Sequence, residues 1–230
     1  APDDLHYMIL KQLVIYKPAF VLTEKPLTLD LDEAREIIEI YKDIPVIVNF
    51  RRKFVPEINE LKHKISNGYY GEFLFGNSYY GKGFKHNGCH LINLMFHLLN
   101  NKWSSFIIED EIFDYENNDP SYSLTLKDDN KCSFSIKAVD QNHYGIFEFD
   151  LFFKKGRIRI KDTGFKIEEF KVKKNQIFPT FKTIEKDSEY STQLNNSLLL
   201  TVDHIYQFLT EKGELICTLN EVYFEMNFMN

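Results

Sequence analysis

Residues 19–26 of the chain are AFVLTEKP, an apolar run of strand length that ends in a charged turn. A run of this kind is typical of a buried strand in a parallel sheet. A second one, PVIVNF, occupies residues 45–50. Between the two, Asp30 and Glu33 have the spacing of a capping box, and the apolar residues that follow recur at helical spacing. The stretch therefore predicts a strand, a helix and a second strand, the order found in open α/β sheets.

The residues before this stretch predict one more helix, which Pro18 ends. Its apolar face consists of Leu5, Met8, Ile9 and Leu13. A free-standing α/β domain would not begin with a crossover helix that no strand precedes, and the sequence contains neither G-x-G-x-x-G nor G-x-x-x-x-G-K. We therefore expect residues 1–50 to be the C-terminal part of a nucleotide-binding domain, with about two or three βαβ units of roughly 30 residues each upstream of this sequence.

After residue 50 the pattern changes to many short strands. Pro56 at the start and Gly68 at the end mark one helix. Strand-like runs then occupy residues 73–80, 105–109, 122–126, 133–139, 146–153, 157–160 and 165–170. Turn signals separate them, so we expect neighbouring strands to pair antiparallel as hairpins. Further helices are expected at residues 89–99, 193–210 and 221–229. Residues 51–230 therefore predict an α+β domain with one large, mostly antiparallel, open sheet.

The composition excludes several classes of protein. With 28 basic and 34 acidic side chains the formal net charge is −6, which argues against a nucleic-acid binder. A hydrophobic share of 43% supports a packed core and argues against long disorder. No apolar run approaches the roughly 18 residues that span a bilayer, so no membrane contact is expected. Three scattered cysteines fit reduced thiols, and we expect a cytoplasmic protein.

Two short motifs carry side chains that suit chemistry. Glu24-Lys25-Pro26 places a lysine at the carboxyl end of a buried strand, where open α/β sheets bind ligands. Gly88-Cys89-His90-Leu91-Ile92-Asn93 opens a helix with a histidine in its first turn. Taken alone, an ordinary turn lysine and a structural histidine explain these two motifs better than a functional role does.

The order of several motifs resembles a known family. The features are Pro2, His6, Glu24-Lys25-Pro26, then NFRRKFVP at residues 49–56, NGYYG at 67–71 and GCHLIN at 88–93. In this order they resemble the glucose–fructose oxidoreductase / inositol dehydrogenase (Gfo/Idh/MocA) family. The specific motifs lie in residues 1–95, and residues 190–230 match only in helix pattern. The resemblance implies a Rossmann NAD(P)-binding domain, of which residues 1–50 are the C-terminal part, followed by a substrate and oligomerisation domain at 51–230.

The resemblance also implies roles for individual residues. Lys25 matches the lysine that lies beside the nicotinamide ribose and the reacting hydroxyl, and His90 matches the histidine that acts as general base or acid. Pro2 and Glu24 match positions that shape the nicotinamide-ribose end of the cofactor site. Arg52 matches the second arginine of a pair at which a cofactor or substrate contact is expected. A buried ammonium stabilises a developing alkoxide, and a neutral imidazole takes and returns its proton.

The sequence departs from the family at two positions near His90. Many members have an aspartate four residues before the histidine and another three residues after it, where this chain has His86 and Asn93. Asn93 keeps a hydrogen-bonding oxygen but carries no charge. Either His86 or Asn87 replaces the missing carboxylate, or His90 and Lys25 work without it, or the protein is not a dehydrogenase. We expect substrate contacts from His86, Asn87 and Asn93.

Two other clusters of residues are interpreted as having no functional role. His86 and His90, with Cys89 and His97 nearby, raise the question of a metal site, but we expect Gly88 to interrupt the helix, and no acidic ligand has matching spacing. We therefore predict no metal. The basic run KVKK at residues 171–174 is interpreted as a solvated loop.

The sequence thus predicts an NAD- or NADP-dependent oxidoreductase. It would transfer a hydride between nicotinamide and a hydroxyl or keto carbon of a sugar or sugar nucleotide, and the chain alone would be inactive without the G-x-G-x-x-G half. The alternative is a non-catalytic relative that acts as a binding, regulatory or dimerisation module. We also expect a homodimer or higher homo-oligomer through the outer sheet face, unless charges such as Lys137, Glu148 and Arg159 keep that face solvated.

Overall fold

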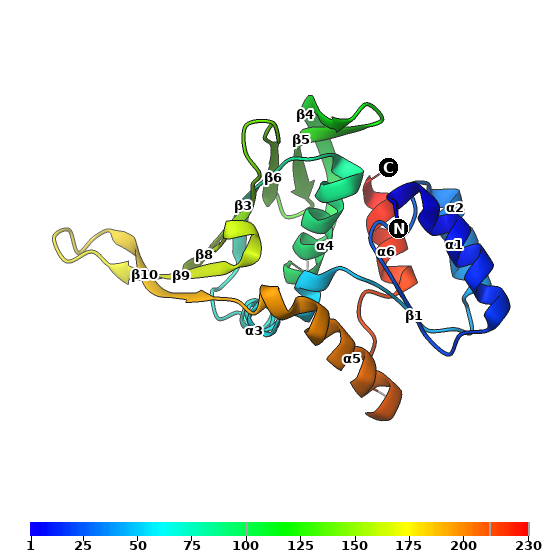
Figure 1. Cartoon of the computed structure of the whole chain (residues 1–230). Helices are drawn as coiled ribbons and strands as arrows, with labels where there is room; N and C mark the ends of the chain where they lie inside the picture. Colours follow the sequence, from blue (N-terminus) through cyan, green and yellow to red (C-terminus); the bar gives the residue numbers. More distant parts are fainter. Residues whose placement is uncertain (100, 212, 230) are drawn as a thin grey trace.

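The chain is described by a computed structural model, which covers residues 1–99, 101–211 and 213–229. Over these residues the buried apolar side chains form two clusters. One lies between the N-terminal elements and the C-terminal helix, which lie side by side in Figure 1. The other fills the space between a large sheet and two helices. The fold combines a small parallel α/β unit with a large open sheet, as the sequence predicts.

The N-terminal α/β unit has the predicted order of elements. Its helices and strands are α1 (His6–Leu13), β1 (Val21–Thr23), α2 (Leu31–Ile40) and β2 (Val46–Val48). The two strands are parallel, with Val21 opposite Val46. The Asp30 carboxylate accepts hydrogen bonds from the backbone N–H groups of Asp32, at 2.8 Å, and Glu33, at 3.2 Å. This confirms the predicted start of α2.

The large sheet has the strand order β10-β9-β8-β7-β3-β6-β5-β4 in the described part of the chain. Its strands are β3 (Phe73–Tyr80), β4 (Trp103–Glu116), β5 (Asp119–Asp128), β6 (Ser133–Ala138), β7 (Phe147–Phe153), β8 (Gly156–Lys161), β9 (Lys166–Lys174) and β10 (Lys182–Ser191). Hairpin pairing holds for most neighbours but not for β3, which lies between β6 and β7 and is parallel to β6. The sheet is therefore mixed.

The predicted loop at residues 171–174 is wrong, because these residues belong to β9 and pair with β10. Strand β10 itself was not predicted. Its side chains are mostly polar and exposed, so it has no hydrophobic alternation to reveal it. Lys171 and Lys173 instead form cross-strand ion pairs with Asp187, at 2.7 Å, and Glu185, at 3.1 Å.

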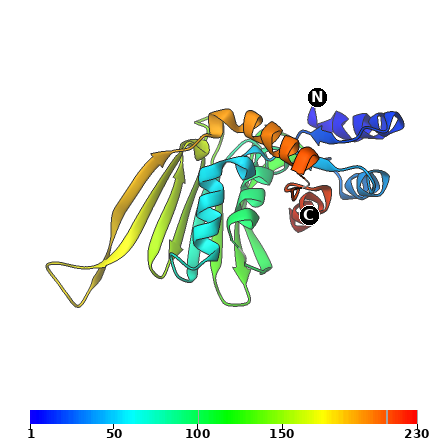
Figure 2. The same cartoon turned by 90° about the horizontal axis from the view of Figure 1, so that it is seen from below.

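Helices α3 (Pro56–Ser66) and α4 (Cys89–Leu98) lie across one face of the large sheet (Figure 2). Most side chains of α4 are buried, because this helix lies between the sheet and other helices. Alternate residues of the strands face it; on β7 these are Phe147, Phe149, Leu151 and Phe153. The inner face thus makes a continuous apolar core that holds α4 in a fixed position.

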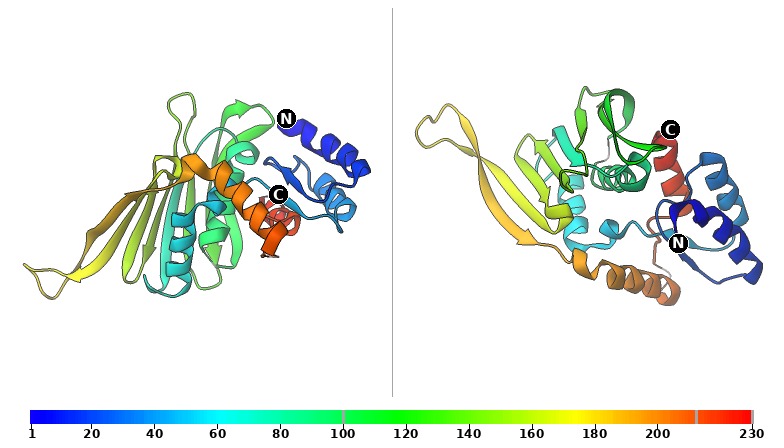
Figure 3. Two further views of the ribbon diagram at one scale, coloured as in Figure 1. Left: turned by 60° about the horizontal axis from the view of Figure 1, so that its bottom comes forward. Right: turned by 45° about the horizontal axis from the view of Figure 1, so that its top comes forward.

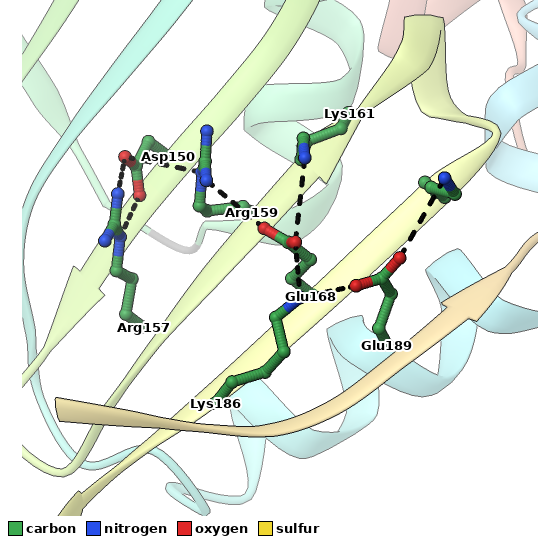
Figure 4. A network of polar contacts seen from close by, with 8 residues as sticks. Asp150, Arg157, Arg159, Lys161, Glu168, Lys186 and Glu189 are labelled. Atoms are coloured by element: carbon green, nitrogen blue, oxygen red, sulfur yellow. Dashed lines mark hydrogen bonds and ion pairs between the residues drawn. The ribbon is translucent and has the colours of Figure 1, made fainter.

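The outer face of the sheet carries a network of charges between β7 and β10 (Figure 4). Glu168 accepts from Arg159 at 3.2 Å and Lys186 at 2.8 Å, while Arg157 donates to Asp150 at 2.6 Å. Next to it lies an aromatic pair, Phe75 and Phe152, stacked at 4.4 Å. The outer face is therefore both charged and aromatic, rather than uniformly rich in Phe and Tyr.

The end of the chain returns to the N-terminal unit. Helix α5 (Ser197–Glu211) runs from the sheet toward the N-terminal elements, and α6 (Leu219–Met229) packs in their core (Figure 3). The N–H of Val48 donates to the carbonyl of Cys217 at 2.9 Å, which extends the small sheet. The predicted capping box is confirmed, because Thr218 accepts from the N–H of Glu221 and Glu221 accepts from the N–H of Thr218. The predicted domain boundary near residue 50 stays a prediction. It assigns α6 to the second domain, although this helix packs against the N-terminal elements.

Candidate functional site

The carboxyl ends of the two parallel strands carry polar side chains that contact each other. The Asn49 amide, just after β2, donates to the Glu24 carboxylate, just after β1, at 2.8 Å. On its other side Asn49 lies 3.5 Å from the hydroxyl of buried Thr201, on α5. The two strand ends and α5 therefore meet at one place, the edge at which parallel sheets bind ligands.

Lys25 follows Glu24 and reaches across to the second half of the molecule. Its Nζ donates to the backbone carbonyl of His86 at 2.7 Å. His86 lies in a π-helical turn, Phe84–Gly88, that leads directly into α4. The ammonium is half-buried and keeps two further N–H groups that this bond does not use. Lys25 thus joins the end of β1 to the start of α4.

His90 lies in the first turn of α4, one turn after the carbonyl that Lys25 contacts. Its ring is half-buried and meets the ring of Phe50 edge-on, with centroids 5.5 Å apart. Burial lowers the pKa of His90 well below its usual 6.5, and the positive charges of Arg52, Lys25 and Arg51 lower it further. The imidazole is therefore neutral near pH 7 and is able to accept a proton.

Arg52 lies close enough to His90 to affect its pKa, but its own contacts are with residues of the predicted second domain. Its Nε and Nη2 donate to the carbonyl of Thr163, at 3.2 and 2.9 Å, and its guanidinium lies over the ring of Phe147 at 3.9 Å. Burial, followed by the charge of Arg51, lowers the pKa of Arg52 to about 9. The structure gives Arg52 a packing and electrostatic role, and a cofactor contact by this residue stays a prediction.

The residues expected to contact substrate are engaged within the protein. The His86 ring lies 2.8 Å from the Asp3 carboxylate and stacks on Tyr115 at 4.5 Å. The Asn87 amide donates to the carbonyl of Gly81 at 2.8 Å. Substrate contacts by His86 and Asn87 stay predictions.

Asn93 belongs to a buried polar group on another side of α4. Its amide donates to the Glu225 carboxylate of α6 at 2.7 Å, and Glu225 also accepts from Lys53 at 3.1 Å. All three side chains are almost fully buried. The structure therefore uses Asn93 to tie α4 to α6, and its predicted contact with substrate is untested.

The prediction that Gly88 interrupts the helix is wrong. Its dihedral angles, φ −58° and ψ −32°, are helical, so the π-helical turn continues into α4. A Cβ at this position would lie 2.6 Å from the ring of Phe84, so glycine serves close packing here rather than a break. Over the described ranges, no group of three or more His, Cys, Asp and Glu side chains is arranged to hold a metal ion.

Two recesses lie near the site. Pro2 lines a polar recess of about 380 Å³ together with Asp3, Lys85 and Tyr115. A second cavity, of about 290 Å³ and mainly apolar, lies between α4, α6 and the β4–β5 end of the sheet. Its lining contains neither Lys25 nor His90, but it includes their chain neighbours Pro26 and Cys89.

Sequence reasoning did not find the partners of the turn before α4. These partners are Asp3 and Asp119. Asp3 and His86 are separated by 83 positions, and Asp119 lies 33 positions from His86. An aspartate just before Pro120, at the start of a strand, is a weak sign of a turn, and nothing local links it to α4.

The residues at the ends of β1 and β2 suit the nicotinamide ribose of a dinucleotide, but they do not suit its pyrophosphate. An ammonium, an amide and a carboxylate suit the hydroxyl groups of a nicotinamide ribose. A pyrophosphate needs free N–H groups at a helix N-terminus. At α2, the helix after β1, the Asp30 carboxylate already takes two such groups, and Asp32 and Glu33 add negative charge to its first turn. This helix is therefore unsuited to hold a pyrophosphate.

Comparison with known proteins gives structural likeness without close sequence likeness. No protein-family model matches the chain, and no curated protein matches it. An NAD-binding oxidoreductase from Klebsiella pneumoniae is similar with a TM-score of 0.76 and 11% identity, over 100% of this chain and 74% of the other. An inositol dehydrogenase homolog from Azotobacter vinelandii, complexed with NADH and myo-inositol, gives 0.72 and 11%, over 99% and 72%.

A super-repressor mutant of Gal80p from Saccharomyces cerevisiae is also similar, with a TM-score of 0.77 and 12% identity, over 99% of this chain and 74% of the other. At such identities the likeness shows the fold. The chain therefore shares the architecture of these proteins along almost its whole length. The solved structures with this architecture include both oxidoreductases and a protein described as a repressor mutant.

The described residues contain no helix that is both long and apolar enough to cross a membrane.

Proposed function

We propose that the protein is an NAD(P)-dependent oxidoreductase that acts on a hydroxyl or keto carbon of a sugar or sugar nucleotide. One observation carries the proposal: the Lys25 ammonium, from the end of a parallel strand, bonds to the turn that opens the helix of His90. The bond directs a positive charge from the ligand-binding edge of the small sheet to the segment that precedes His90, which supports the proposal. The similarity to NAD-binding oxidoreductases supports the choice of cofactor.

Each group has a distinct task in this proposal. Lys25 donates hydrogen bonds to the substrate oxygen and stabilises negative charge on it as an alkoxide forms. His90, neutral because of its lowered pKa, takes the hydroxyl proton in oxidation and returns it in reduction. Glu24 and Asn49, already hydrogen-bonded to each other, would orient the nicotinamide ribose. When NAD(P) is bound, its nicotinamide supplies the hydride acceptor or donor.

We propose further that the 230-residue chain does not by itself hold the dinucleotide. The sequence has no glycine-rich phosphate-binding turn, and the N-terminus of α2 is occupied by its own cap. A protein that also carries such a turn would bind NAD(H) or NADP(H). Isothermal calorimetry on both proteins tests this. Tight binding by the 230-residue chain would refute the pyrophosphate argument, and no binding by the longer protein would refute the oxidoreductase.

The second candidate is a non-catalytic relative that binds a ligand or a partner protein. The observation that favours it is the engagement of the residues around His90: His86 with Asp3, and Asn93 with Glu225. Neither provides the free carboxylate that many members of the resembled family carry there. Cofactor binding without any turnover on a panel of sugars and sugar nucleotides would favour this candidate over the oxidoreductase.

A further inference from the structure

The segment between β3 and α4, residues 81–88, connects the carbonyl that Lys25 contacts to the helix that carries His90. Lys25 bonds to a carbonyl of this segment, and His90 follows it in the next turn. Within the segment, Gly83 has a positive φ of +77° and directly precedes the π-helical turn. The turn is closed by the N–H groups of Asn87 and Gly88, which donate to the Gly83 carbonyl at 3.1 and 3.0 Å, so the N–H groups of its first residues need acceptors outside the turn.

Two hydrogen bonds from Asp119, at the start of β5, hold the segment. Its Oδ1 accepts the backbone N–H of Lys85 at 2.7 Å, and its Oδ2 accepts that of His86 at 2.9 Å. The carboxylate is buried, with 7% of the residue exposed. A Cβ at Gly83 would lie 2.2 Å from Oδ2, so glycine is required there for the carboxylate to approach. Asp119 thus binds the N–H of His86, the residue whose carbonyl accepts from Lys25.

Asp114, on the paired strand β4, holds the start of the same segment. Its carboxylate accepts the N–H of Lys82 at 2.7 Å and the hydroxyl of Ser121 at 2.7 Å. The Ser121 hydroxyl in turn accepts the N–H of Gly83 at 2.9 Å. Burial alone would raise the pKa of Asp114, but these donors hold it below its usual value, so it stays ionised.

We propose that Asp119, supported by Asp114, is a positioning residue that fixes the turn before α4, so that the His86 carbonyl holds the Lys25 ammonium beside His90. The proposal rests on the proposed roles of Lys25 and His90. It assigns β4 and β5 of the large sheet a direct part in aligning a lysine that follows β1 with a histidine on α4. Without Asp119, two part-buried N–H groups lose their acceptor, and we expect the turn to move to satisfy them.

The electrostatic surroundings of His90 make this displacement observable. The charged and titratable groups that act on His90 are Lys25 after β1, Arg51 and Arg52 after β2, and His86 in the turn. When the turn moves, Lys25 loses its anchor, and its positive charge opposes protonation of His90 less strongly. The pKa of His90 then rises toward its usual value.

The experiment is a pH titration of the His90 ring by ¹⁵N and ¹³C NMR in the 230-residue chain. We expect Asp119→Ala to raise the pKa of His90, and Asp119→Asn, which keeps the shape and one acceptor, to raise it less. The Lys25→Met variant should raise it too, and Lys25→Met with Asp119→Ala should raise it no more than Lys25→Met alone. That lack of additivity is a result that general loosening would not give.

Asp128→Ala is the matched control. Asp128 lies at the other end of β5, is equally buried, and accepts from the N–H of Cys132 at 2.8 Å and the amide of Asn101 at 2.6 Å. We expect it to leave the pKa of His90 unchanged. An unshifted His90 in Asp119→Ala, or in Asp119→Asn if the alanine variant does not fold, overturns the proposal, and so does an equal shift in Asp128→Ala. Because no cofactor enters the titration, absence of NAD(P) binding would refute the proposed function and leave this result standing.

Discussion

At the end of β1, one hydrogen bond connects two parts of the chain that are 61 positions apart: Lys25 Nζ to the carbonyl of His86. The bond leaves the ammonium with two N–H groups that it does not use, at the segment that leads to His90. In the proposed mechanism the amine and the imidazole provide charge stabilisation and proton transfer without a carboxylate. At the scale of single residues, the proposed function depends on this pair.

Replacing either member of the pair tests this dependence. In a protein that binds NAD(P), we expect Lys25→Ala and His90→Ala each to lower kcat/KM by about 10²–10⁴-fold, because each removes charge stabilisation or proton transfer in the transition state. Steady-state kinetics, with circular dichroism to show an intact fold, measures the effect. Lys17→Ala, an exposed lysine in the loop before β1, is the control and should keep the parental rate. Near-parental rates in both variants would refute the assigned roles.

The sequence singles out Lys25 and His90 as candidates, but it does not predict the contacts of the residues near His90. Lys25 and His90 stand in motifs whose order is visible along the chain. The contacts of Asn93 with Glu225 and of His86 with Asp3 join positions 132 and 83 residues apart, and no local pattern encodes such pairings. The contacts of these interior side chains can therefore be assigned only from the three-dimensional structure.

At the scale of elements, helices and buried strands followed from the sequence with errors of a few residues. The cap at Asp30 and the capping box at Thr218 placed the starts of α2 and α6. The sheet order was not predictable in the same way. Strand β3 pairs with β6 and β7, which are distant in sequence, and β10 is held by ion pairs rather than by buried apolar side chains.

The charge network on the outer face predicts a pH dependence of stability. The hydrogen bond from Lys186 is the main cause that lowers the pKa of Glu168 below its usual 4.5. A carboxylate with a lowered pKa in the folded state stabilises the protein above the pKa of the unfolded chain. This contribution is lost as the pH falls through the folded-state pKa.

We therefore expect Glu168→Gln to reduce the free energy of unfolding near pH 7 by roughly 1–3 kcal/mol. The variant should also lose less stability than the parent between about pH 5 and pH 3. Urea unfolding at a series of pH values measures both effects. Glu39→Gln, an exposed change on α2, is the control and should behave as the parent. A parent and a Glu168→Gln variant with parallel pH profiles would contradict the expectation.

At the scale of the whole molecule, the outer face of the sheet is the surface on which a second copy is expected. Phe75 and Phe152 form a stacked pair there, and Phe75 is 40% exposed. The ion pairs beside them satisfy one another within the chain, so the aromatic pair is the part of the face that gains most from cover.

We expect the chain to sediment as a dimer or larger species at micromolar concentration, and Phe75→Glu to shift it toward monomer, because the new charge would be buried without a partner. Analytical ultracentrifugation measures this. Ile177→Glu, at the exposed end of the β9–β10 hairpin, is the control and should leave the distribution unchanged. A parent chain that sediments only as monomer would show that the charges keep the face solvated.

The convergence of Lys25 and His90 is tested most directly by the pKa of His90, measured by NMR in the parent chain, in Lys25→Met and in Lys85→Met. Lys85 lies on the same turn, but its ammonium donates to the carbonyl of Leu29. We predict a pKa well below 6.5 in the parent and in Lys85→Met, and a higher one in Lys25→Met, because Lys25, unlike Lys85, is among the positive charges that lower the pKa of His90. An identical pKa in all three proteins would show that the amine and the imidazole do not share a site.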